Sequence, residues 1–339
     1  MTAKTESIQF EFRGDDVVLA PGELFRSEFE QPYRDSPAAT VREITQRIAS
    51  GTPWRESVRT AYERANPWLF RIITDPLRHR FLMSNPFPAG SLVLDVGAGW
   101  GQYSLPLAAS CSVCVLEPTG ERLDFIRAVS QQEGLASRMY FVQSDYFATE
   151  FSTQFDYACC IGVLEWVGAL KQGSSAHDLQ LEFLRRLRGD IRDGGTLLLG
   201  IENRLGLKYL LGARDDHTGV ANISTYDRDL AGRKWEAMGR RSLRIHTYTR
   251  AELTGMLKEA GFEHIEFHAA FPDYKLTQVL LPWGEAVDDY FLGGQFVPEH
   301  DGYDGSPLEI QQELQSHYRS LAHLRIASDF APSFFVTAR

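Results

Sequence analysis

The chain has 339 residues, 43% hydrophobic and 24% charged, with a formal net charge of −10. That length is enough for one large or two modest domains with a buried core. The excess of acidic residues argues against a surface that follows nucleic-acid phosphates, so we expect no nucleic-acid partner. Residues 1–16 are polar, and no apolar run approaches the roughly 20 residues that span a bilayer. We therefore expect a soluble cytoplasmic protein without membrane insertion; a homo-oligomer is compatible with the sequence, but no feature indicates one.

The four cysteines form two close pairs, Cys111 with Cys114 and Cys159 with Cys160. An odd separation on a strand sends the two side chains to opposite faces, so neither pair is placed to chelate a metal or to form a local disulfide. We expect small buried side chains in a reducing compartment.

The first 80 residues carry few strand signals and several helical ones, over 38–49 and 57–72. They predict an N-terminal helical domain, 1–80. Its aromatic stretch 62–71 is open to two interpretations, a layer packed on the rest of the chain or a lid over a ligand.

From residue 91 onward strands and helices alternate, a pattern typical of a mostly parallel sheet with helices on both faces. The predicted strands are 92–96, 113–116, 139–143, 157–161, 196–201, 263–269 and 333–337. The predicted helices are 120–133, 176–192 and 250–260, the last opened by a capping box at Thr249 and Glu252.

The first of these strands leads into a glycine-rich turn, in which Asp95 is followed by Gly97, Ala98, Gly99 and Gly101. Glycine allows positive φ and a close approach of ligand to backbone. The spacing differs from the Gly-x-Gly-x-x-Gly of dinucleotide folds, which counts against a nucleotide-dependent oxidoreductase. An acid before the glycines suits a cation, and S-adenosylmethionine carries an ammonium and a sulfonium. We interpret the turn as a methyl-donor site; the alternative is a turn that binds nothing.

Acids also follow the next two strands. Glu117, with Pro118 behind it, is placed to accept both ribose hydroxyls, unless it is only a solvated loop carboxylate. Asp145 is placed to accept from the adenine amine, with Tyr146 packing on the ring. Because the carboxyl ends of parallel strands share one sheet edge, these residues and the loop at Gly162 converge. The predicted cofactor-binding residues are Asp95, Gly97, Ala98, Gly99, Gly101, Glu117, Pro118, Asp145, Tyr146 and Gly162.

On these residues, 82–271 resembles the class I S-adenosylmethionine-dependent methyltransferases. Residues 93–101 match the family's first motif, Glu117 its ribose acid and Asp145 its adenine-side acid. Residues 162–165 match the segment after the fourth strand, but Trp166 replaces a histidine found in many members, so no catalytic histidine is carried over there. The resemblance implies an α/β, Rossmann-like, seven-stranded mixed sheet whose last two strands form an antiparallel hairpin. It also implies S-adenosylmethionine as cofactor, S-adenosylhomocysteine as product, and a methyltransferase domain over 81–339 with acceptor-side insertions at about 203–247 and 272–326.

Three further segments, 201–208, 216–219 and 272–275, are similar to a bacterial methyltransferase subgroup often found with glycosyltransferases and surface-polysaccharide machinery. This likeness suggests a saccharide acceptor by analogy.

Methyl transfer from a sulfonium is an in-line displacement that depends on positioning, and a hydroxyl acceptor also needs a base. His217, in the polar loop 212–219, is our candidate base. Asp216 would orient it, or Asp215 in its place, and Glu202 ends the fifth strand nearby. The alternative is a turn in which the aspartates cap backbone N–H groups and His217 lies on the surface.

Candidate substrate-binding residues are Glu165, Asn203, Asp273, Tyr274 and Lys275. Each has a plain alternative, a carboxylate bound to backbone or a surface ion pair of little energy. Oxygen-rich side chains here would suit a divalent cation, but nothing in the spacing demands one, and we expect no metal. The basic stretch 228–244 is interpreted as a solvated face, or alternatively as a site for an anionic acceptor.

The sequence therefore predicts a methyltransferase that modifies a hydroxyl of a saccharide or small molecule, using a base from a loop. The alternatives are a carboxyl- or N-methyltransferase of a natural-product pathway and a non-catalytic cofactor-binding scaffold. The acceptor, the methylated atom and the role of residues 276–326 are not specified by the sequence.

Overall fold

A computed structural model describes the chain except residues 1–6, 29–33, 170, 172 and 298–307. It divides into two compact units. Unit 1 comprises Met1–Ile161 and Gly189–Leu197, and unit 2 comprises Gly162–Arg188 and Leu198–Arg339. Each unit has its own core, and each is described separately below.

The strands of unit 1 are β1 (Ile8–Phe12), β2 (Asp15–Leu19), β3 (Leu24–Arg26), β4 (Leu92–Val96), β5 (Ser112–Leu116), β6 (Met139–Gln143), β7 (Thr149–Phe151) and β8 (Phe155–Ile161). The order β8-β4-β5-β6-β3 is parallel throughout. Every residue of β4 and β5 is buried, as expected for parallel strands covered on both faces.

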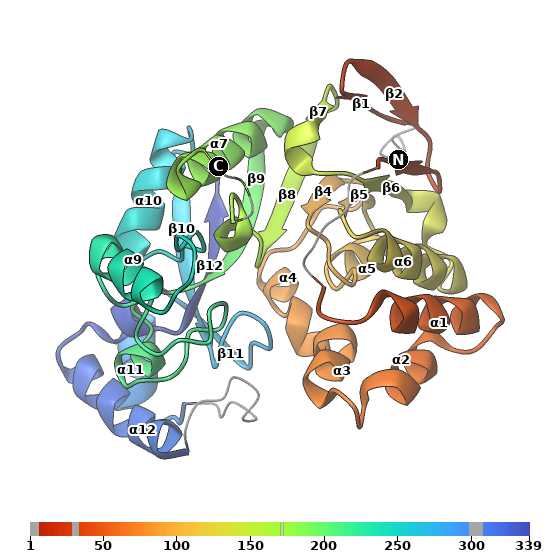
Figure 1. Cartoon of the computed structure of the whole chain (residues 1–339). Helices are drawn as coiled ribbons and strands as arrows, with labels where there is room; N and C mark the ends of the chain where they lie inside the picture. The colour runs from red at the N-terminus through yellow and green to blue at the C-terminus, as the bar shows by residue number, and fades with distance from the viewer. Residues whose placement is uncertain (1–6, 29–33, 170, 172, 298–307) are drawn as a thin grey trace. The chain divides into compact units, whose positions relative to one another are not determined.

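The helices of unit 1 are α1 (Ala38–Ala49), α2 (Trp54–Tyr62), α3 (Pro67–Thr74), α4 (Phe81–Ser84), α5 (Ser104–Leu107) and α6 (Gly120–Gln132). Helix α1 packs beside α2 and α6 (Figure 1). The predicted helix 57–72 is interrupted because Asn66 caps a new helix, accepting a hydrogen bond from the Leu69 N–H, and Pro67 occupies its first position.

The N-terminal region corrects one expectation, because strands β1, β2 and β3 precede the predicted helices. Strand β1 pairs antiparallel with β2 and with β7. Its residues alternate, with Ile8 and Phe10 buried and Gln9 and Glu11 exposed, which is the period-two pattern of a half-buried strand. The boundary predicted at residue 80 and the role of 1–80 as a lid stay predictions.

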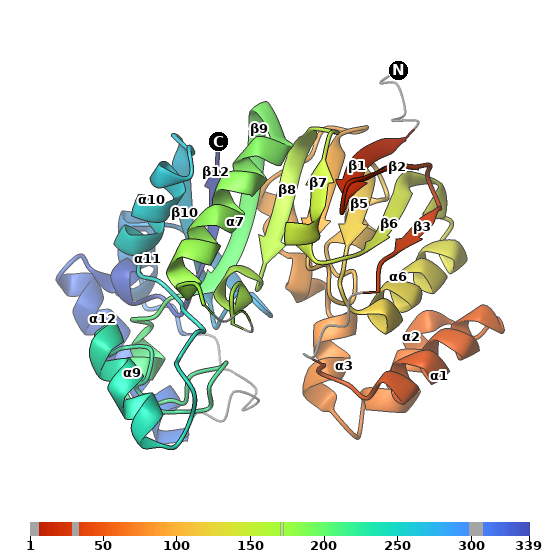
Figure 2. The ribbon, with the colours of Figure 1, turned by 45° about the horizontal axis from the view of Figure 1, so that its top comes forward.

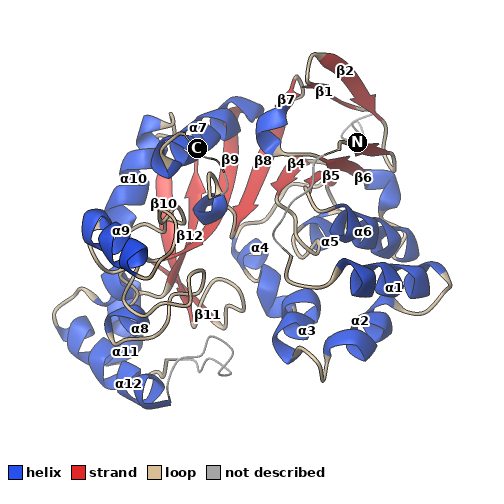
Figure 3. Cartoon of the chain, in the orientation of Figure 1, coloured by secondary structure: helices blue, strands red, loops and turns tan. Residues whose placement is uncertain are grey.

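Strand β9 (Ile191–Glu202) runs from unit 1 into unit 2. Beside it unit 2 contributes β12 (Ser333–Ala338), β10 (Ile265–Phe271) and β11 (Val279–Pro282), in that order. Strand β10 is antiparallel to both β12 and β11, so the predicted antiparallel pair of last strands is confirmed. The seven predicted strands are all present in a mixed α/β sheet flanked by helices, with β3 and β11 as additional strands (Figures 2 and 3).

The helices of unit 2 are α7 (Ala176–Asp190, its last two residues in unit 1), α8 (Leu207–Leu210), α9 (Arg228–Ala237), α10 (Arg250–Glu259), α11 (Glu285–Leu292) and α12 (Leu308–His323). Described residues of the segment without a predicted role, 276–326, contribute to an apolar core in which the rings of Phe291 and Tyr318 stack, 4.7 Å apart and 11° from parallel. Helices α11 and α12 pack together around it (Figure 3).

All four cysteines are buried and none of them forms a disulfide. Cys114, Cys159 and Cys160 lie on strands, and Cys111 directly precedes β5. Within the described part of the chain, none of the helices combines the length and apolar character needed to cross a bilayer.

The capping box at the start of α10 is confirmed, since Thr249 Oγ1 accepts from the Glu252 N–H at 3.2 Å and Glu252 Oε2 accepts from the Thr249 N–H at 2.8 Å. We expect Thr249→Ala to lower the free energy of unfolding by about 1 kcal/mol, because it leaves the first turn of α10 uncapped. Urea denaturation of the full chain measures the change. Thr254→Ala, inside the same helix, is the matched control, and an equal loss there would refute capping as the cause.

Candidate active site

The predicted donor site lies entirely in unit 1, apart from Gly162. Gly97, Gly99 and Gly101 have φ of 68°, 59° and 77°, values that only glycine adopts readily. The N–H groups of Gly97 and Ala98 both donate to the carbonyl of Leu116 at the end of β5, at 2.8 and 3.2 Å. The turn is therefore fastened to the neighbouring strand by its own backbone.

The two acids predicted to bind the cofactor lie at the ends of adjacent strands. Asp95, in β4, is buried and accepts a hydrogen bond from the Ser104 hydroxyl; burial raises its pKa to about 6. Glu117, after β5, accepts from the N–H groups of Gly99 at 2.8 Å and Thr119 at 2.9 Å. Each carboxylate oxygen keeps a second lone pair, so Glu117 shapes the glycine turn while retaining capacity for ligand hydroxyls.

The two predicted residues after β6, Asp145 and Tyr146, differ in their burial and in their contacts. Asp145 is half-buried and caps a short 3-10 helix (Tyr146–Ala148), accepting from the Phe147 N–H at 2.9 Å. Tyr146 is only 4% exposed, and its hydroxyl donates to Asp190. The predicted packing of Tyr146 on the adenine ring stays a prediction.

A contact that sequence reasoning missed connects the N-terminal segment to this turn. The Trp100 indole N–H, within the turn, donates to Asp35 at 2.9 Å. Asp35 also pairs with Arg122 at 2.7 Å, and Arg122 lies 3.8 Å from Glu117. Because Trp100 is 2% exposed and meets the Tyr62 ring edge-on, this part of 1–80 packs against the turn as a layer.

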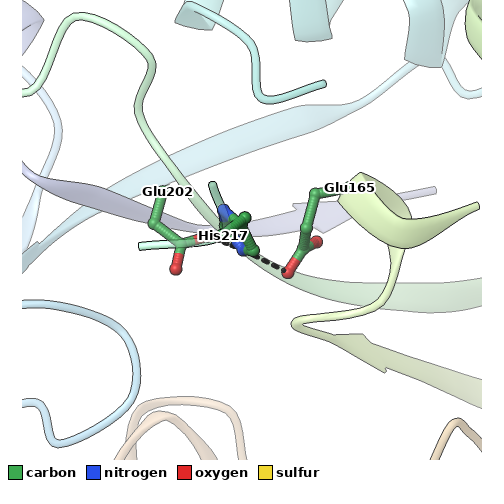
Figure 4. Close-up of side chains that lie close together, drawn as sticks. All are labelled: Glu165, Glu202 and His217. Carbon is green, nitrogen blue, oxygen red and sulfur yellow. Dashed lines mark ion pairs between the residues drawn. The ribbon is translucent and has the colours of Figure 1, made fainter. Parts of the chain in front are cut away.

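Unit 2 brings together a second group of predicted residues around His217. Its Nε2 lies 3.4 Å from Glu165 Oε1 and 3.5 Å from Glu202 Oε2 (Figure 4). Glu165 comes from the 3-10 helix Leu164–Trp166, and Glu202 is the last residue of β9. The three side chains are 5%, 0% and 1% exposed, so His217 is not a surface residue of a turn.

Two lysines complete this group. Lys275 Nζ lies 2.6 Å from Glu202 Oε1 and 2.7 Å from Asp216 Oδ2, and Lys208 Nζ lies 3.4 Å from Asp216 Oδ1. The six-residue set Glu165, Glu202, Lys208, Asp216, His217 and Lys275 is called the buried charge cluster below. Sequence reasoning missed Lys208, although it ends the segment 201–208 that carried the subgroup likeness.

The cluster fixes the protonation of its members. Burial would lower the pKa of His217, but Glu202 and Glu165 raise it to about 9. Burial would raise the pKa of Asp216, yet Lys208 and Lys275 hold it well below its usual range. The pKa of Glu202 is likewise lowered, against burial, by Lys275 and His217, whereas burial raises that of Glu165. At neutral pH the imidazolium therefore stands between two carboxyl groups.

The cluster retains capacity for a polar ligand. Among the described residues, Glu165 Oε2 and Glu202 Oε2 have no hydrogen-bond partner although both are buried. Buried carboxylate oxygens ordinarily have partners, so these two are candidate acceptors for ligand hydroxyls. Glu165, Glu202 and His217 also offer atoms within 4.8 Å of one another, enough for a cation. Since Lys208 and Lys275 already supply positive charge here, the absence of a metal stays our expectation.

The remaining predicted substrate residues divide into two groups. Tyr274 points its hydroxyl at Glu165 Oε1 from 3.5 Å, and Gly162 is required beside it, because a Cβ there would lie 2.5 Å from the Tyr274 oxygen. The amide of Asn203 binds the backbone, since its Nδ2 donates to the carbonyls of Asp329 and Ala331 and its Oδ1 accepts from the Leu205 N–H. Its role in substrate binding stays a prediction.

The buried Asp273 and Asp215 shape the loops that present cluster residues. Asp273 Oδ1 accepts from the N–H groups of Lys275 and Leu276, and Asp215 Oδ1 accepts from those of His217 and Thr218. The sequence offered a turn capped by aspartates as the alternative to a functional His217. In the structure the capped turn is present, and it positions the buried His217 side chain.

We expect the His217 imidazole to titrate near pH 9 in the folded chain, as measured by NMR of its ring protons. Because that pKa lies above the ordinary 6.5, the associated stabilisation is complete below about pH 6.5 and is lost as pH rises through about 9. Glu165→Gln should lower the His217 pKa, whereas Glu182→Gln, exposed on α7, should leave it unchanged. A His217 pKa near 6.5 in the unaltered chain would contradict the electrostatics described above.

Residues 67–266 match the family model described as a methyltransferase domain, which covers more than half of the chain. Comparison with curated protein sequences finds no significant match. Among solved structures, the chain is similar to phosphoethanolamine N-methyltransferase 2 from Haemonchus contortus, in complex with phosphomonomethylethanolamine and S-adenosylhomocysteine. That match has 15% identity and a TM-score of 0.43, and covers 78% of this chain but only 52% of that enzyme, about half its length.

Two further solved structures are similar. The CcbJ methyltransferase from Streptomyces caelestis matches with 16% identity and a TM-score of 0.47, over 78% of this chain and 89% of that one. An S-adenosylmethionine-dependent methyltransferase from Geobacter sulfurreducens, in complex with S-adenosylhomocysteine, matches with 16% identity and a TM-score of 0.42, over 85% and 97%. With the family model spanning 67–266, from α3 through β10, the chain belongs to the methyltransferase domain family.

Proposed function

We propose that the chain transfers a methyl group from S-adenosylmethionine to a hydroxyl of a saccharide or small-molecule acceptor. The glycine turn of unit 1 would hold the donor, and the buried charge cluster of unit 2 would hold the acceptor. The observation that carries the acceptor assignment is His217, buried between Glu165 and Glu202, with Glu165 Oε2 and Glu202 Oε2 both lacking a hydrogen bond among the described residues.

On the donor side, the acids and the turn supply complementary groups. The Asp95 carboxylate would attract the cationic end of the donor, and the Glu117 oxygens would accept from the ribose hydroxyls. The bare backbone of Gly97, Gly99 and Gly101 permits close approach of the ligand. Asp145, Ala98 and Pro118 border the same strand ends. The donor itself supplies a methyl group on a sulfonium, a strong electrophile that needs no further activation.

On the acceptor side, the chemistry requires a proton to leave. In the proposed reaction, neutral His217 would accept the hydroxyl proton at Nε2 as that oxygen is methylated. The resulting imidazolium is stabilised by Glu165 and Glu202, which raise its pKa. A hydroxyl held by Glu202 Oε2, which lies 3.5 Å from that nitrogen, would be within its reach.

A saccharide fits this environment because it offers several hydroxyls. Glu165, Glu202, Tyr274 and Lys275 present donors and acceptors at short range. The half-buried Trp166 ring lies 5.3 Å from the His217 ring and offers an apolar face for the carbon–hydrogen side of a sugar. The likeness of segments 201–208, 216–219 and 272–275 to the polysaccharide-associated subgroup points the same way by analogy.

The donor assignment is tested by calorimetric titration with S-adenosylmethionine. Asp95→Asn should weaken binding roughly tenfold or more, since a hydrogen bond to a charged group contributes about 1.5–3 kcal/mol. Asp16→Asn, an exposed position on β2, should bind like the unaltered chain. Undiminished affinity of the Asp95 variant would remove this residue from the donor site.

The acceptor assignment is tested by transfer of labelled methyl into fractionated carbohydrate and small-molecule acceptor pools. Label should enter saccharide or other hydroxyl-bearing fractions, and the rate should rise with pH towards about 9 as neutral His217 accumulates. His217→Gln should slow transfer about 100-fold or more, and His264→Gln, exposed before β10, should not.

Other outcomes distinguish the remaining functions. A rate that does not rise with pH, with label in acidic or amine metabolites, would favour carboxyl or N-methylation. Cofactor binding without transfer to any pool would favour a non-catalytic scaffold. An unimpaired His217→Gln variant would refute base catalysis by this residue.

A further inference from the structure

A pocket in unit 2 opens directly beside the buried charge cluster, since His217 and Thr218 form part of its wall. About 490 Å³ of space lies between its walls, with the open solvent at its mouth included. Its opposite wall belongs to the start of α9 and to the segment that precedes α10, with Arg228, His246 and Thr247 among its residues. An acceptor bound at His217 would therefore extend into this space.

Two guanidinium groups line the pocket and share one carboxylate. Arg204 uses three of its five N–H donors, on the carbonyls of Ser224 and Tyr226 and on Glu252 Oε1 at 2.7 Å. Arg228 lies 3.9 Å from that same Glu252 oxygen. At this wall one carboxylate, Glu252, therefore faces two guanidiniums, while the other carboxylate at the pocket, Asp215, lies beside His217.

Arg228 has more unused N–H donors than Arg204. It directs one N–H at His246 Nδ1 from 2.6 Å and another at the Thr247 carbonyl from 3.4 Å, which leaves three of the five N–H donors of a guanidinium. Its side chain is 35% exposed, so these donors are accessible from the pocket.

His246 adds a donor of fixed direction. Since arginine can only donate, Nδ1 of His246 is the acceptor of the Arg228 bond, and a neutral ring then carries its proton on Nε2. Burial and the neighbouring Arg228 lower the pKa of His246 to about 4, so the ring is neutral at pH 7. The one carboxylate in the pocket wall, Asp215, uses Oδ1 for the backbone N–H groups of His217 and Thr218.

We propose that this pocket binds an anionic group of the acceptor, a phosphate or a carboxylate, through Arg228 and the Nε2–H of His246. The proposal rests on the function proposed for the neighbouring cluster and narrows its substrate class to acidic or phosphorylated acceptors. It also gives a role to the basic stretch 228–244, where Arg240 donates to the Thr218 carbonyl at the same wall. The apolar side chains of Ile223, Leu243 and Ile245 would cover the uncharged part of the ligand.

The experiment is an NMR titration of the full chain with inorganic phosphate and, separately, with acetate, at constant ionic strength and without cofactor. We expect saturable shifts of the Gly232 and Thr247 amide signals with either or both anions. Arg228→Gln should weaken binding at least tenfold, and His246→Phe should weaken it as an independent variant if the first does not fold. Arg233→Gln, exposed on the same helix and outside the pocket wall, is the matched control.

Saturable binding of phosphate that depends on Arg228 or His246 but not on Arg233 would support a phosphorylated acceptor, and the same pattern with acetate would support an acidic one. Lack of saturable binding, or binding weakened equally by Arg233→Gln, would overturn the proposal. Because neither measurement involves methyl transfer, failure here is distinguishable from failure of the proposed enzymatic function.

Discussion

The balance of charge around His217 is the interaction on which the rest of unit 2 depends. Three carboxyl groups, two ammonium groups and one imidazole are buried together, and each pairs with an opposite charge at 2.6–3.5 Å. Removing one partner from such a set leaves an uncompensated buried charge, which costs about 3–5 kcal/mol. The members come from five separate segments, so the same pairs that set protonation also fasten the loops after β9 and β10 to the end of β9.

Unit 1 positions its functional groups by a different kind of constraint. There the backbone conformation fixes the site, because the glycine turn needs three positive φ values and two N–H bonds to the Leu116 carbonyl. The side chains then follow, with Glu117 accepting from the turn and Trp100 reaching Asp35. Local geometry of this sort depends on residues close in sequence or on adjacent strands.

The difference between long-range charge pairs and local backbone geometry explains which parts of the two sites could be predicted from the sequence. The glycine turn and its acids are contiguous or lie at strand ends, and continuous apolar runs marked β4, β5 and β6 to within a residue or two. The capping box of α10 was equally local. The charge cluster depends on pairs such as Lys208 with Asp216 and Lys275 with Glu202. These side chains are brought together by the conformations of loops, which the periodicity of apolar residues does not predict.

The contacts that the sequence did not indicate have the same origin. Asn203 carries a side chain suited to ligands and follows a strand in the expected place, and its amide binds the backbone at residues 329 and 331, far along the chain. Strands β1 and β2 are short, and β1 is completed by pairing with β7, more than 130 residues later. The Tyr146 hydroxyl donates to Asp190, which also lies far away in sequence.

The electrostatics of the cluster bear on the type of acceptor. Raising the pKa of His217 to about 9 makes the imidazole a stronger base, although only roughly one molecule in a hundred is neutral at pH 7. Such a base is useful for a hydroxyl, which is weakly acidic, and has no use for a carboxylate, which is already deprotonated. A carboxylate at this point would also be repelled by Glu165 and Glu202.

An acceptor that carries an anionic group must therefore place that group away from its reacting oxygen. The protein must then offer a separate positive charge to bind the anionic group. In the proposed pocket beside His217, Arg228 supplies that charge and neutral His246 a hydrogen-bond donor, so a hydroxyl nucleophile and an anionic substituent are compatible within one acceptor.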